Sequence, residues 1–503
     1  MLRGMPNILL ALVAALIAAP ALAGVDTAYP QAKGWFPEAS RFGELEGEPE
    51  GKPRAAPVYA DGAIAGYVFL TSDVVRIPAY SGKPINSLVG VDRAGRIRGV
   101  AIVEHEEPIL AVGVSEARLR AFTDQYAGKS VLDRVVVGAE RPGTVAVDTI
   151  SGATITVMVQ NETLMQAARK VAQSRGLTSI QPTTKQEPVW RGVWRERKFA
   201  IAVLVTGLLT LNFILLFQDW FARRPKLLGI VRRAFLVYTV FFIGWYALAQ
   251  LSIVHVLIFV HAAVREFRWE TFLIDPMLFI LWSFVALTLL LWGRGVYCGW
   301  LCPFGAMQEL LQQLARRFNV RQFEFPDVVH ERLWGLKYLV LIGLFGVSLQ
   351  SMGEAARLAE VEPFKTAVTL RFDREWPFVL YAVALLAVSV FNRKFFCKYL
   401  CPLGAALSIP GRFRVFDWWL RRRKECGRPC QTCARDCEVR AIRPTGEINA
   451  NECHYCLDCQ VTYYSDRRCM PLIERRVKRE QRAVRVTEAA KLIHIKQVAA
   501  PRK

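Results

Sequence analysis

Cysteine is absent from the first 297 residues of this chain, although its 503 residues include 12 cysteines, the first of which is Cys298. Charge is also scarce, since Asp, Glu, Lys and Arg together make up 22% of the residues against 53% hydrophobic residues. This balance excludes a disordered, collagen-like or coiled-coil protein. With a mean hydropathy of +0.23, it indicates a membrane protein with soluble parts. The length allows three or four domains of ~100–200 residues each.

The formal net charge of +21 is unevenly distributed. Residues 1–198 carry a net charge of +3, and residues 199–503 carry +18. A basic region can bind nucleic acid, but basic loops between apolar helices are the more common cause. We therefore expect a membrane protein that binds no nucleic acid.

The N-terminus is typical of a secretory signal peptide. Arg3 precedes the apolar run Ile8–Ala19, and Ala21-Leu22-Ala23 is a cleavage site of small residues. An uncleaved anchor is the alternative, although the apolar stretch is short for a membrane span. The segment that follows is exported in either case. Because a disulfide scaffold would place cysteines in that segment, their absence there indicates thiolates on a reducing side of the membrane.

The pattern beyond the signal peptide predicts a multi-domain membrane protein. Period-two runs at Ala65–Leu70, Leu88–Val91 and Ile97–Val103 predict strands, Asp92–Gly95 a turn, and Val157–Gln173 a helix, which together indicate an exported α+β domain. The expected divisions are a signal peptide 1–23, a linker or exported extension 24–57, a periplasmic α+β domain 58–178, a transmembrane region 199–412, a ferredoxin-like domain 413–475 and a basic tail 476–503.

Five apolar segments are candidate membrane spans, and a sixth short or re-entrant segment is Ile253–Val264. The five are Phe199–Phe217, Ala234–Leu251, Pro276–Trp292, Leu336–Gln350 and Phe378–Phe391. Basic loops follow the first, third and fifth, so these spans are expected to exit to the cytoplasm. The sequence thus predicts an α-helical bundle in a bacterial inner membrane, with the N-terminal domain in the periplasm and the C-terminal part in the cytoplasm. The run Arg421–Lys424 is expected to contact anionic lipid headgroups.

Eight cysteines in the C-terminal part have the spacing of iron–sulfur ligands. Three closely spaced cysteines can wrap a cubane, and in two-cluster ferredoxins the fourth ligand comes from the other motif. Two [4Fe-4S] clusters are therefore predicted, the first on Cys426, Cys430, Cys433 and Cys469 and the second on Cys453, Cys456, Cys459 and Cys437. Structural zinc is the alternative, because paired Cys-x2-Cys units also bind zinc. Between the two groups, Ala441–Ile448 is expected to form a strand and turn.

The other four cysteines lie in an internal repeat. Residues 296–306 and 395–405 share the pattern Cys-x3-Cys-Pro at an offset of 99 residues, each directly after an apolar span. If each segment is helical, its two thiols share one face. Cys298, Cys302, Cys397 and Cys401 could hold a metal or cluster or act as dithiols, and simple packing of cysteine in apolar surroundings is the alternative.

Asp148-Thr-Ile-Ser-Gly-Ala-Thr154 precedes the helix predicted at Val157–Gln173. It resembles the motif at which FMN is attached to threonine through a phosphoester bond. The resemblance implies that Thr154 is the acceptor, with Asp148, Ser151, Gly152 and Ala153 as the rest of the motif and a flavin transferase as a partner. A helix N-terminus would favour the phosphate charge. An unmodified loop is the alternative, because the motif is short.

The order of these motifs resembles that of the NosR/NirI family. The likeness runs from Val58 to about Ile473 and is carried by residues 293–306 and by Cys459–Tyr464, with a shorter exported region than the longer members have. It implies an inner-membrane electron-transfer protein with covalent FMN and two [4Fe-4S] clusters. Such a protein would link quinol or a cytoplasmic donor to a periplasmic denitrification reductase or its maturation factors, nitrous oxide reductase above all. The alternatives are a NapH-like quinol dehydrogenase subunit without flavin, and a membrane-bound redox sensor that regulates reductase expression.

Overall fold

The computed structural model describes most of residues 24–498. The gaps are 48–51, 78–83, 106–113, 115, 139–142, 149, 151–153, 178–188, 265–266, 268, 414 and 416–419. The signal peptide predicted at 1–23 lies outside the described residues. The chain divides into two units, Met1–Arg195 with Val264–Asp275, and Glu196–Ala263 with Pro276–Lys503. We call them the N-terminal unit and the helical unit.

The N-terminal unit is built on an antiparallel meander of five strands in chain order. They are β1 (Arg41–Phe42), β2 (Ala56–Ala60), β3 (Ala63–Leu70), β4 (Asn86–Asp92) and β5 (Ile97–Glu104). The turn expected after β4 forms because Asp92 Oδ1 accepts hydrogen bonds of 2.9 Å from the backbone N–H groups of Ala94 and Arg96. Gly95 completes the turn with a φ of +73°, which suits glycine. The three predicted strands correspond to β3, β4 and β5.

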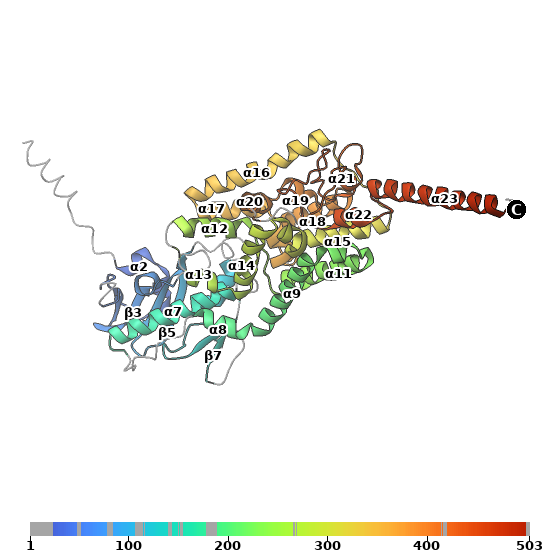
Figure 1. Ribbon diagram of the computed structural model, residues 1–503. Coiled ribbons are helices and arrows are strands. Elements are labelled where there is room, and N and C mark those ends of the chain that lie inside the picture. The colour runs from blue at the N-terminus through green and yellow to red at the C-terminus, as the bar shows by residue number, and fades with distance from the viewer. Residues whose placement is uncertain are drawn as a thin grey trace, which may run out of the picture. The chain divides into compact units, whose positions relative to one another are not determined.

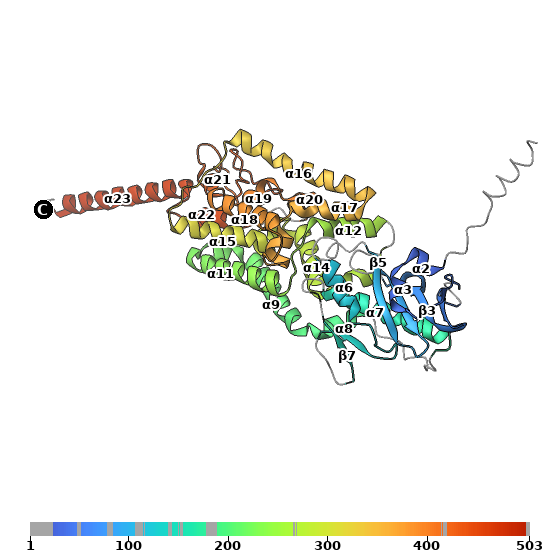
Figure 2. The same cartoon turned by 180° about the vertical axis from the view of Figure 1, so that it is seen from behind.

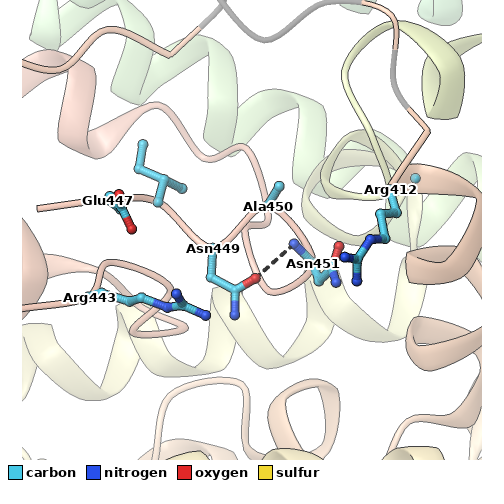
Figure 3. A pocket seen from close by; sticks show the side chains of 8 residues that line it. Arg412, Arg443, Glu447, Asn449, Ala450 and Asn451 are labelled. Atoms are coloured by element: carbon cyan, nitrogen blue, oxygen red, sulfur yellow. Dashed lines mark hydrogen bonds between the residues drawn. The ribbon is translucent and has the colours of Figure 1, made fainter. Parts of the chain in front are cut away.

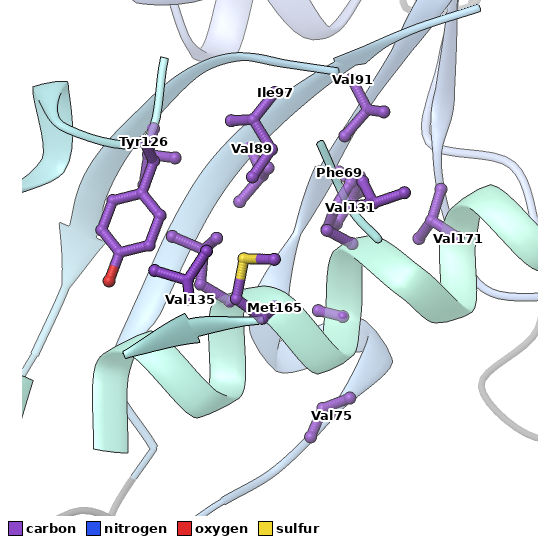
Figure 4. Close-up of a cluster of buried hydrophobic side chains, with 14 of the residues drawn as sticks. Phe69, Val75, Val89, Val91, Ile97, Tyr126, Val131, Val135, Met165 and Val171 are labelled. Atoms are coloured by element: carbon purple, nitrogen blue, oxygen red, sulfur yellow. The ribbon is translucent and has the colours of Figure 1, made fainter. Parts of the chain in front are cut away.

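One face of this sheet is covered by α7 (Thr154–Ser174), which contains the helix predicted at Val157–Gln173. Leu164, Ala168 and Val171 of α7 recur at helical spacing and are fully buried. Figure 4 shows Met165 and Val171 among Phe69, Val89 and Val91 of the strands. The same core includes residues of α4 (Thr71–Val74), α6 (Glu116–Asp124) and the parallel pair β6 (Val135–Val137) and β7 (Val145–Val147), or packs against them.

The residues 24–57 that were expected to form a linker or extension are largely folded, which corrects that boundary. They form α2 (Val25–Ala28), α3 (Gln31–Trp35), β1 and the start of β2. Val25, Ala32 and Phe36 make a second core with residues of β2, β3 and β4. Burial of these apolar side chains against the sheet holds α2 and α3 in the N-terminal unit.

The N-terminal unit also includes the distant segment Val264–Asp275. This segment contains α13 (Trp269–Leu273) and follows the rest of the unit by about 70 residues of chain. Ile274 is 5% exposed within the main core, and Trp194 of α8 (Val189–Glu196) donates a 2.8 Å hydrogen bond from Nε1 to the Leu273 carbonyl. The unit is therefore assembled from two separate stretches of sequence.

The helical unit contains a helix at each of the five predicted spans (Figures 1 and 2). Those long and apolar enough to cross a membrane are α9 (Lys198–Leu216), α11 (Pro225–Tyr238) continued by the π-helix η1 (Thr239–Tyr246), and α16 (Asp327–Gln350). Shorter apolar helices are α12 (Ile253–Val264), α14 (Pro276–Leu291) and α18 (Trp376–Phe391). A helix of 16 residues extends ~24 Å, less than the ~30 Å hydrocarbon core.

Further helices connect these elements and form the C-terminal part of the chain. Between and beside the apolar helices are α10 (Gln218–Ala222), η2 (Tyr297–Leu301), α15 (Pro303–Arg317), α17 (Met352–Leu358), η3 (Ala359–Val361), η4 (Lys365–Thr369), α19 (Phe395–Tyr399) and α20 (Pro402–Gly411). The cysteine-rich tail contains α21 (Thr432–Asp436), α22 (Asp458–Tyr464) and the long α23 (Met470–Val498). In the tail, loops rather than helices carry most of the cysteines.

Candidate iron–sulfur and flavin sites

The two Cys-x3-Cys-Pro motifs adopt the same local structure at their second cysteine. Cys302 is the N-cap of α15, and Cys401 is the N-cap of α20. Their Sγ atoms accept hydrogen bonds from the backbone N–H of Gly305 at 3.4 Å and of Gly404 at 3.3 Å. The proline after each motif occupies the first turn of its helix, where its missing N–H costs nothing. A helix N-terminus stabilises a thiolate, so both sulfurs are suited to bind a cation or cluster.

The structure brings all four repeat cysteines together. Cys302, Cys397 and Cys401 are buried, and Cys298 is partly buried. The pKa of Cys397 is raised to about 11, mainly by burial, with the Lys394 charge opposing the rise and the Cys298 thiol adding to it. Each of the four thiols interacts electrostatically with the other three, so they occupy one neighbourhood. The expectation of a shared helical face is modified, because Cys298 lies in the π-helix η2 and Cys302 follows it in extended backbone.

Buried charges surround the four thiols. Arg232 forms a two-pronged ion pair with Glu309 at 2.7 and 2.8 Å, and Lys394 contacts the same carboxylate at 2.7 Å. Arg294 donates to Glu452 at 3.1 Å and to the Gly404 carbonyl at 2.8 Å.

A fourth cation, Lys337, pairs with Glu452. Although burial raises the pKa of Cys298, the positive charges of Arg294, Lys337 and Lys394 each lower it. The net pKa shift of Cys298 is still upward, so the cations offset only part of the effect of burial.

Five of the tail cysteines line one pocket. Four of them, Cys437, Cys453, Cys456 and Cys459, are the set expected to hold the second cluster, and the fifth is Cys433 of the first set. Cys437 raises the pKa of both Cys456 and Cys459, after the larger effect of burial, so it lies beside them despite its distance in sequence. Cys453 Sγ accepts a 3.4 Å hydrogen bond from the Tyr455 N–H. This arrangement fits a cubane held by four thiolates.

The other expected ligands lie nearby. Cys426 and Cys430 both raise the pKa of Cys433, after the larger effect of burial, which places these three cysteines together. Cys426 Sγ accepts a 3.3 Å hydrogen bond from the Arg423 N–H. Cys469 is buried immediately before α23. Its membership of the first group stays a prediction.

Two features of the cysteines bear on the identity of the metal. All 12 are free thiols, so the structure contains no disulfide. In the described part of the chain, no three Cys, His, Asp or Glu side chains converge as the ligands of a single metal ion would. Neither feature by itself separates cubane clusters from the zinc alternative, and the assignment of these cysteines to [4Fe-4S] clusters stays a prediction.

The segment Ala441–Ile448 forms a turn, and a single β-bridge joins its two ends. Ile442 and Ile448 form this isolated bridge, and Gly446, with a φ of +91°, closes the turn on the Arg443 carbonyl. A strand was expected here, but only the bridge forms. The adjoining polar cavity of about 260 Å³ is lined by Arg412, Arg443, Glu447 and neighbouring residues, with Asn449 accepting from the Asn451 N–H (Figure 3).

The basic run ahead of the clusters bonds mainly within the protein. Arg421 pairs with Asp219 at 2.7 Å, Arg422 donates to the Gly446 carbonyl and Arg423 to the Tyr463 carbonyl. Arg422, Arg423 and Lys424 also line an open cavity together with Cys426. Contact of this run with lipid headgroups stays a prediction.

A contact that the sequence analysis missed joins the tail to the first repeat. Trp300 Nε1 donates a 3.0 Å hydrogen bond to the Tyr455 carbonyl, between two of the tail cysteines. A Cβ atom added at Gly299 would lie 1.8 Å from the His454 carbonyl oxygen, so only glycine allows this approach. Glycine on both sides of Cys298 was visible in the sequence, but nothing there indicated its partner.

The flavin motif is described only in part. Asp148 is exposed, and its backbone N–H donates a 2.6 Å hydrogen bond to Gln125 Oε1. Ser151, Gly152 and Ala153 lie outside the described residues. Thr154 is the first residue of α7, so its backbone stands at the N-terminus of a 21-residue helix. That position suits a phosphoester, because free N–H groups and the helix dipole favour negative charge.

Comparison with known proteins identifies the family. The regulatory protein NosR of Pseudomonas aeruginosa is 37% identical over 89% of this chain and 92% of its own length. The chain belongs to the NosR family. NosR of Stutzerimonas stutzeri is 35% identical with the same coverage, and NirI of Paracoccus denitrificans is 50% identical over 58% of this chain and 42% of its own length. The alignment to NosR of Pseudomonas aeruginosa spans 666 positions, which is more than the 503 residues of this chain. That relative therefore contains insertions.

Three family models divide this NosR-family chain. An FMN-binding domain matches residues 80–169, which include the motif ending at Thr154. A 4Fe-4S binding domain matches twice, at 274–321 and at 375–425, once over each Cys-x3-Cys-Pro motif. A model named NosR matches the cysteine-rich tail at 424–480. The protein is therefore a membrane electron-transport or regulatory protein with FMN-binding and iron–sulfur domains, tied to denitrification.

Proposed function

We propose that this protein carries electrons across the bacterial inner membrane between [4Fe-4S] clusters on its cytoplasmic side and an FMN bound covalently to Thr154 in the periplasm. The observation that carries the proposal is the combination, in one chain, of an FMN-binding domain, apolar helices and two groups of tail cysteines. Flavin and iron–sulfur groups, when bound, supply one-electron redox chemistry. The protein itself supplies their ligands, their spacing and their electrostatic environment.

The orientation follows from the chain's division into units. Residues 24–195 and Val264–Asp275 share the N-terminal unit, so α12 ends and α14 begins on the side of the membrane where that unit lies. If α14 crosses, Cys298 lies on the opposite side, and α16 and α18 return the chain to that side at Cys397. The basic loops favour the cytoplasm for the cysteine side. The N-terminal unit is then periplasmic.

Electrons enter from quinol or from a cytoplasmic donor and leave to a periplasmic denitrification reductase or its maturation factors. Nitrous oxide reductase is the proposed destination, because the relatives with the widest coverage are NosR proteins. A flavin transferase attaches the FMN. Within the tail, N–H groups directed at Cys426 and Cys453 stabilise anionic sulfur, and this hydrogen bonding is one of the means by which proteins set cluster potentials.

The decisive test is flavin fluorescence of the denatured, full-length protein in a gel, after expression with a flavin transferase. We expect a fluorescent band for wild type and none for Thr154→Val, because the phosphoester needs the hydroxyl. Thr163→Val is the matched control: it removes a buried threonine hydroxyl of the same helix, which donates a 2.8 Å hydrogen bond to the Val159 carbonyl. That variant should keep the fluorescence. A dark wild-type band would refute covalent FMN and favour a NapH-like quinol dehydrogenase subunit.

A regulatory role is the second candidate, favoured by the description of the relatives as regulatory proteins. It predicts that reductase transcript levels change with the redox state of this protein. Measuring those transcripts in a strain with Thr154→Val separates the two roles. Unchanged transcripts with lost reductase activity support electron transfer, and changed transcripts support regulation.

A further inference from the structure

Each Cys-x3-Cys-Pro motif has too few thiols to hold a cluster by itself. The first stretch matched by the 4Fe-4S binding model contains only Cys298 and Cys302, and the second only Cys397 and Cys401. Cubane clusters in proteins are held by four cysteine thiolates. Either the two motifs therefore share a cluster, or neither holds one.

The structure places the two pairs in one buried neighbourhood, where every thiol acts on the other three. The second cysteine of each pair caps a helix through the same hydrogen bond from a glycine N–H. The two halves are also held together directly, since Arg294 of the first repeat donates to the Gly404 carbonyl of the second. Gln308, from the helix after the first motif, donates a 3.1 Å hydrogen bond to Cys397 Sγ in the second motif.

The surrounding charges suit an anionic group. Four cations in this region are almost completely buried, namely Arg232, Arg294, Lys337 and Lys394. Carboxylates pair with these cations as well, namely Glu309, Glu452 and Glu438, and Asp458 also acts on Arg232 and Lys394. Arg294 and Lys394 nevertheless act on both Cys298 and Cys397, one thiol from each motif, so these two cations would offset part of the negative charge of an anionic group held between the motifs. A cluster with four thiolate ligands is such an anion, whereas four neutral thiols are not.

From this geometry we infer that Cys298, Cys302, Cys397 and Cys401 together bind one further [4Fe-4S] cluster, shared between the two repeats and separate from those of the tail. This site lies next to the tail cysteines. Gly299, between Cys298 and Cys302, touches the His454 carbonyl, and Trp300 bonds the Tyr455 carbonyl. His454 and Tyr455 stand between Cys453 and Cys456. The shared cluster thus lies where the cysteine-rich tail contacts the apolar helices. Its binding does not depend on the flavin.

The test measures iron and acid-labile sulfide per chain in full-length protein purified without oxygen. If three cubanes are present, replacing Cys298 and Cys302 by serine should remove about one third of the iron. Replacing Cys397 and Cys401 should remove the same third, and replacing all four should remove no more. As a control, Cys437→Ser should reduce iron additively with either pair. Unchanged iron in both pair variants would overturn the proposal in favour of dithiols, and a fourfold variant that loses twice as much would show separate sites.

A second variant keeps all four thiols and guards against misfolding of the serine variants. Gln308→Leu removes the hydrogen bond to Cys397 Sγ. Because a hydrogen bond to cluster sulfur stabilises the reduced state, the midpoint potential of one cluster should fall in an EPR-monitored titration while the iron content stays constant. Potentials that all match wild type would contradict a cluster at this site. Since neither readout involves FMN, failure here is distinguishable from failure of the flavin proposal.

Discussion

Gly299 is the residue at which the first repeat and the cysteine-rich tail touch most closely. A methyl group there would overlap the His454 carbonyl oxygen, which is backbone and cannot rotate away. We expect Gly299→Ala to destabilise the helical unit by about 1–3 kcal/mol, the usual cost of overpacking. The measurement is thermal unfolding in detergent, followed by absorbance of the iron–sulfur groups, which should bleach at a lower temperature than in wild type.

Gly343→Ala provides the matched control for this prediction. Gly343 lies within α16, and nothing lies within 4 Å of the position that its Cβ would occupy. Alanine is also the better helix former, so this variant should be as stable as wild type or slightly more so. Equal unfolding temperatures for Gly299→Ala and wild type would show that the tail does not pack closely against Gly299.

At the scale of single residues, the sequence predicts the type of ligand better than it predicts the tertiary contacts. The spacing of the tail cysteines predicts two groups of ligands, and the structure places Cys437 near Cys456 and Cys459. The division of the eight thiols between two clusters stays a prediction. The contact made by Trp300 could not be predicted, because its partner Tyr455 is 155 residues further along the chain. A local motif specifies ligand type and spacing, whereas the surface that covers it depends on the whole fold.

Among the elements, α11, α15 and the start of α19 are joined by one buried carboxylate. Glu309 of α15 binds Arg232 of α11 and Lys394, the N-cap of α19. Glu309→Gln leaves both cations without their charged partner, and breaking such a buried pair costs about 3–5 kcal/mol. Chemical unfolding of the purified protein should show this loss. Glu354→Gln, which removes an exposed pair with Arg357, should change stability by only about 0–1 kcal/mol.

The same carboxylate makes stability depend on pH. Burial alone would raise the pKa of Glu309, but Arg232 and Lys394 hold it well below its ordinary value. A group whose pKa is lowered by folding contributes stability above its ordinary value, and that contribution disappears as the pH falls towards the folded value. Wild type should therefore lose stability below about pH 4 more steeply than Glu309→Gln. Parallel curves of unfolding temperature against pH would contradict this assignment.

The predicted elements agree with the structure where the pattern is local. Alternation predicted β3, β4 and β5, and helical spacing predicted α7, because each buries one face on the same core. Residues 24–57 were misjudged because α2 and α3 are short and pack by only a few side chains, among them Phe36. A few buried side chains in helices of four and five residues leave too weak a periodic signal in the sequence.

In the whole molecule, the N-terminal unit depends on a segment that follows the apolar helices α9, α11 and α12 of the other unit. Ile274 is 5% exposed in its main core. We expect Ile274→Ala to destabilise the N-terminal unit by about 2–5 kcal/mol through the cavity it leaves. Limited proteolysis of membrane vesicles should release fragments of residues 24–195 faster than in wild type. Trp269→Ala on the same segment, at a side chain that is 63% exposed, should leave the rate unchanged; equal rates for both variants would contradict the prediction.

The membrane architecture was predictable in outline. All five apolar segments form helices, yet only α9, α11 with η1, and α16 have the length of a full span in the described structure. Hydropathy finds apolar segments but not where a helix breaks. The helical conformation is interrupted between η1 and α12, near Cys302. In this interruption the Gln250 side chain donates a 3.0 Å hydrogen bond to Tyr297 Oη.

The two-part construction of the N-terminal unit has a consequence for biogenesis. In the proposed orientation, residues 24–195 reach the periplasm before residues 264–275 have been synthesised. The core then lacks the Ile274 side chain, and Trp194 lacks the Leu273 carbonyl as its hydrogen-bond acceptor. The unit is completed only after α9, α11 and α12 have been inserted and residues 264–275 have been translocated. Folding of the exported part thus reports that the first half of the membrane bundle is in place.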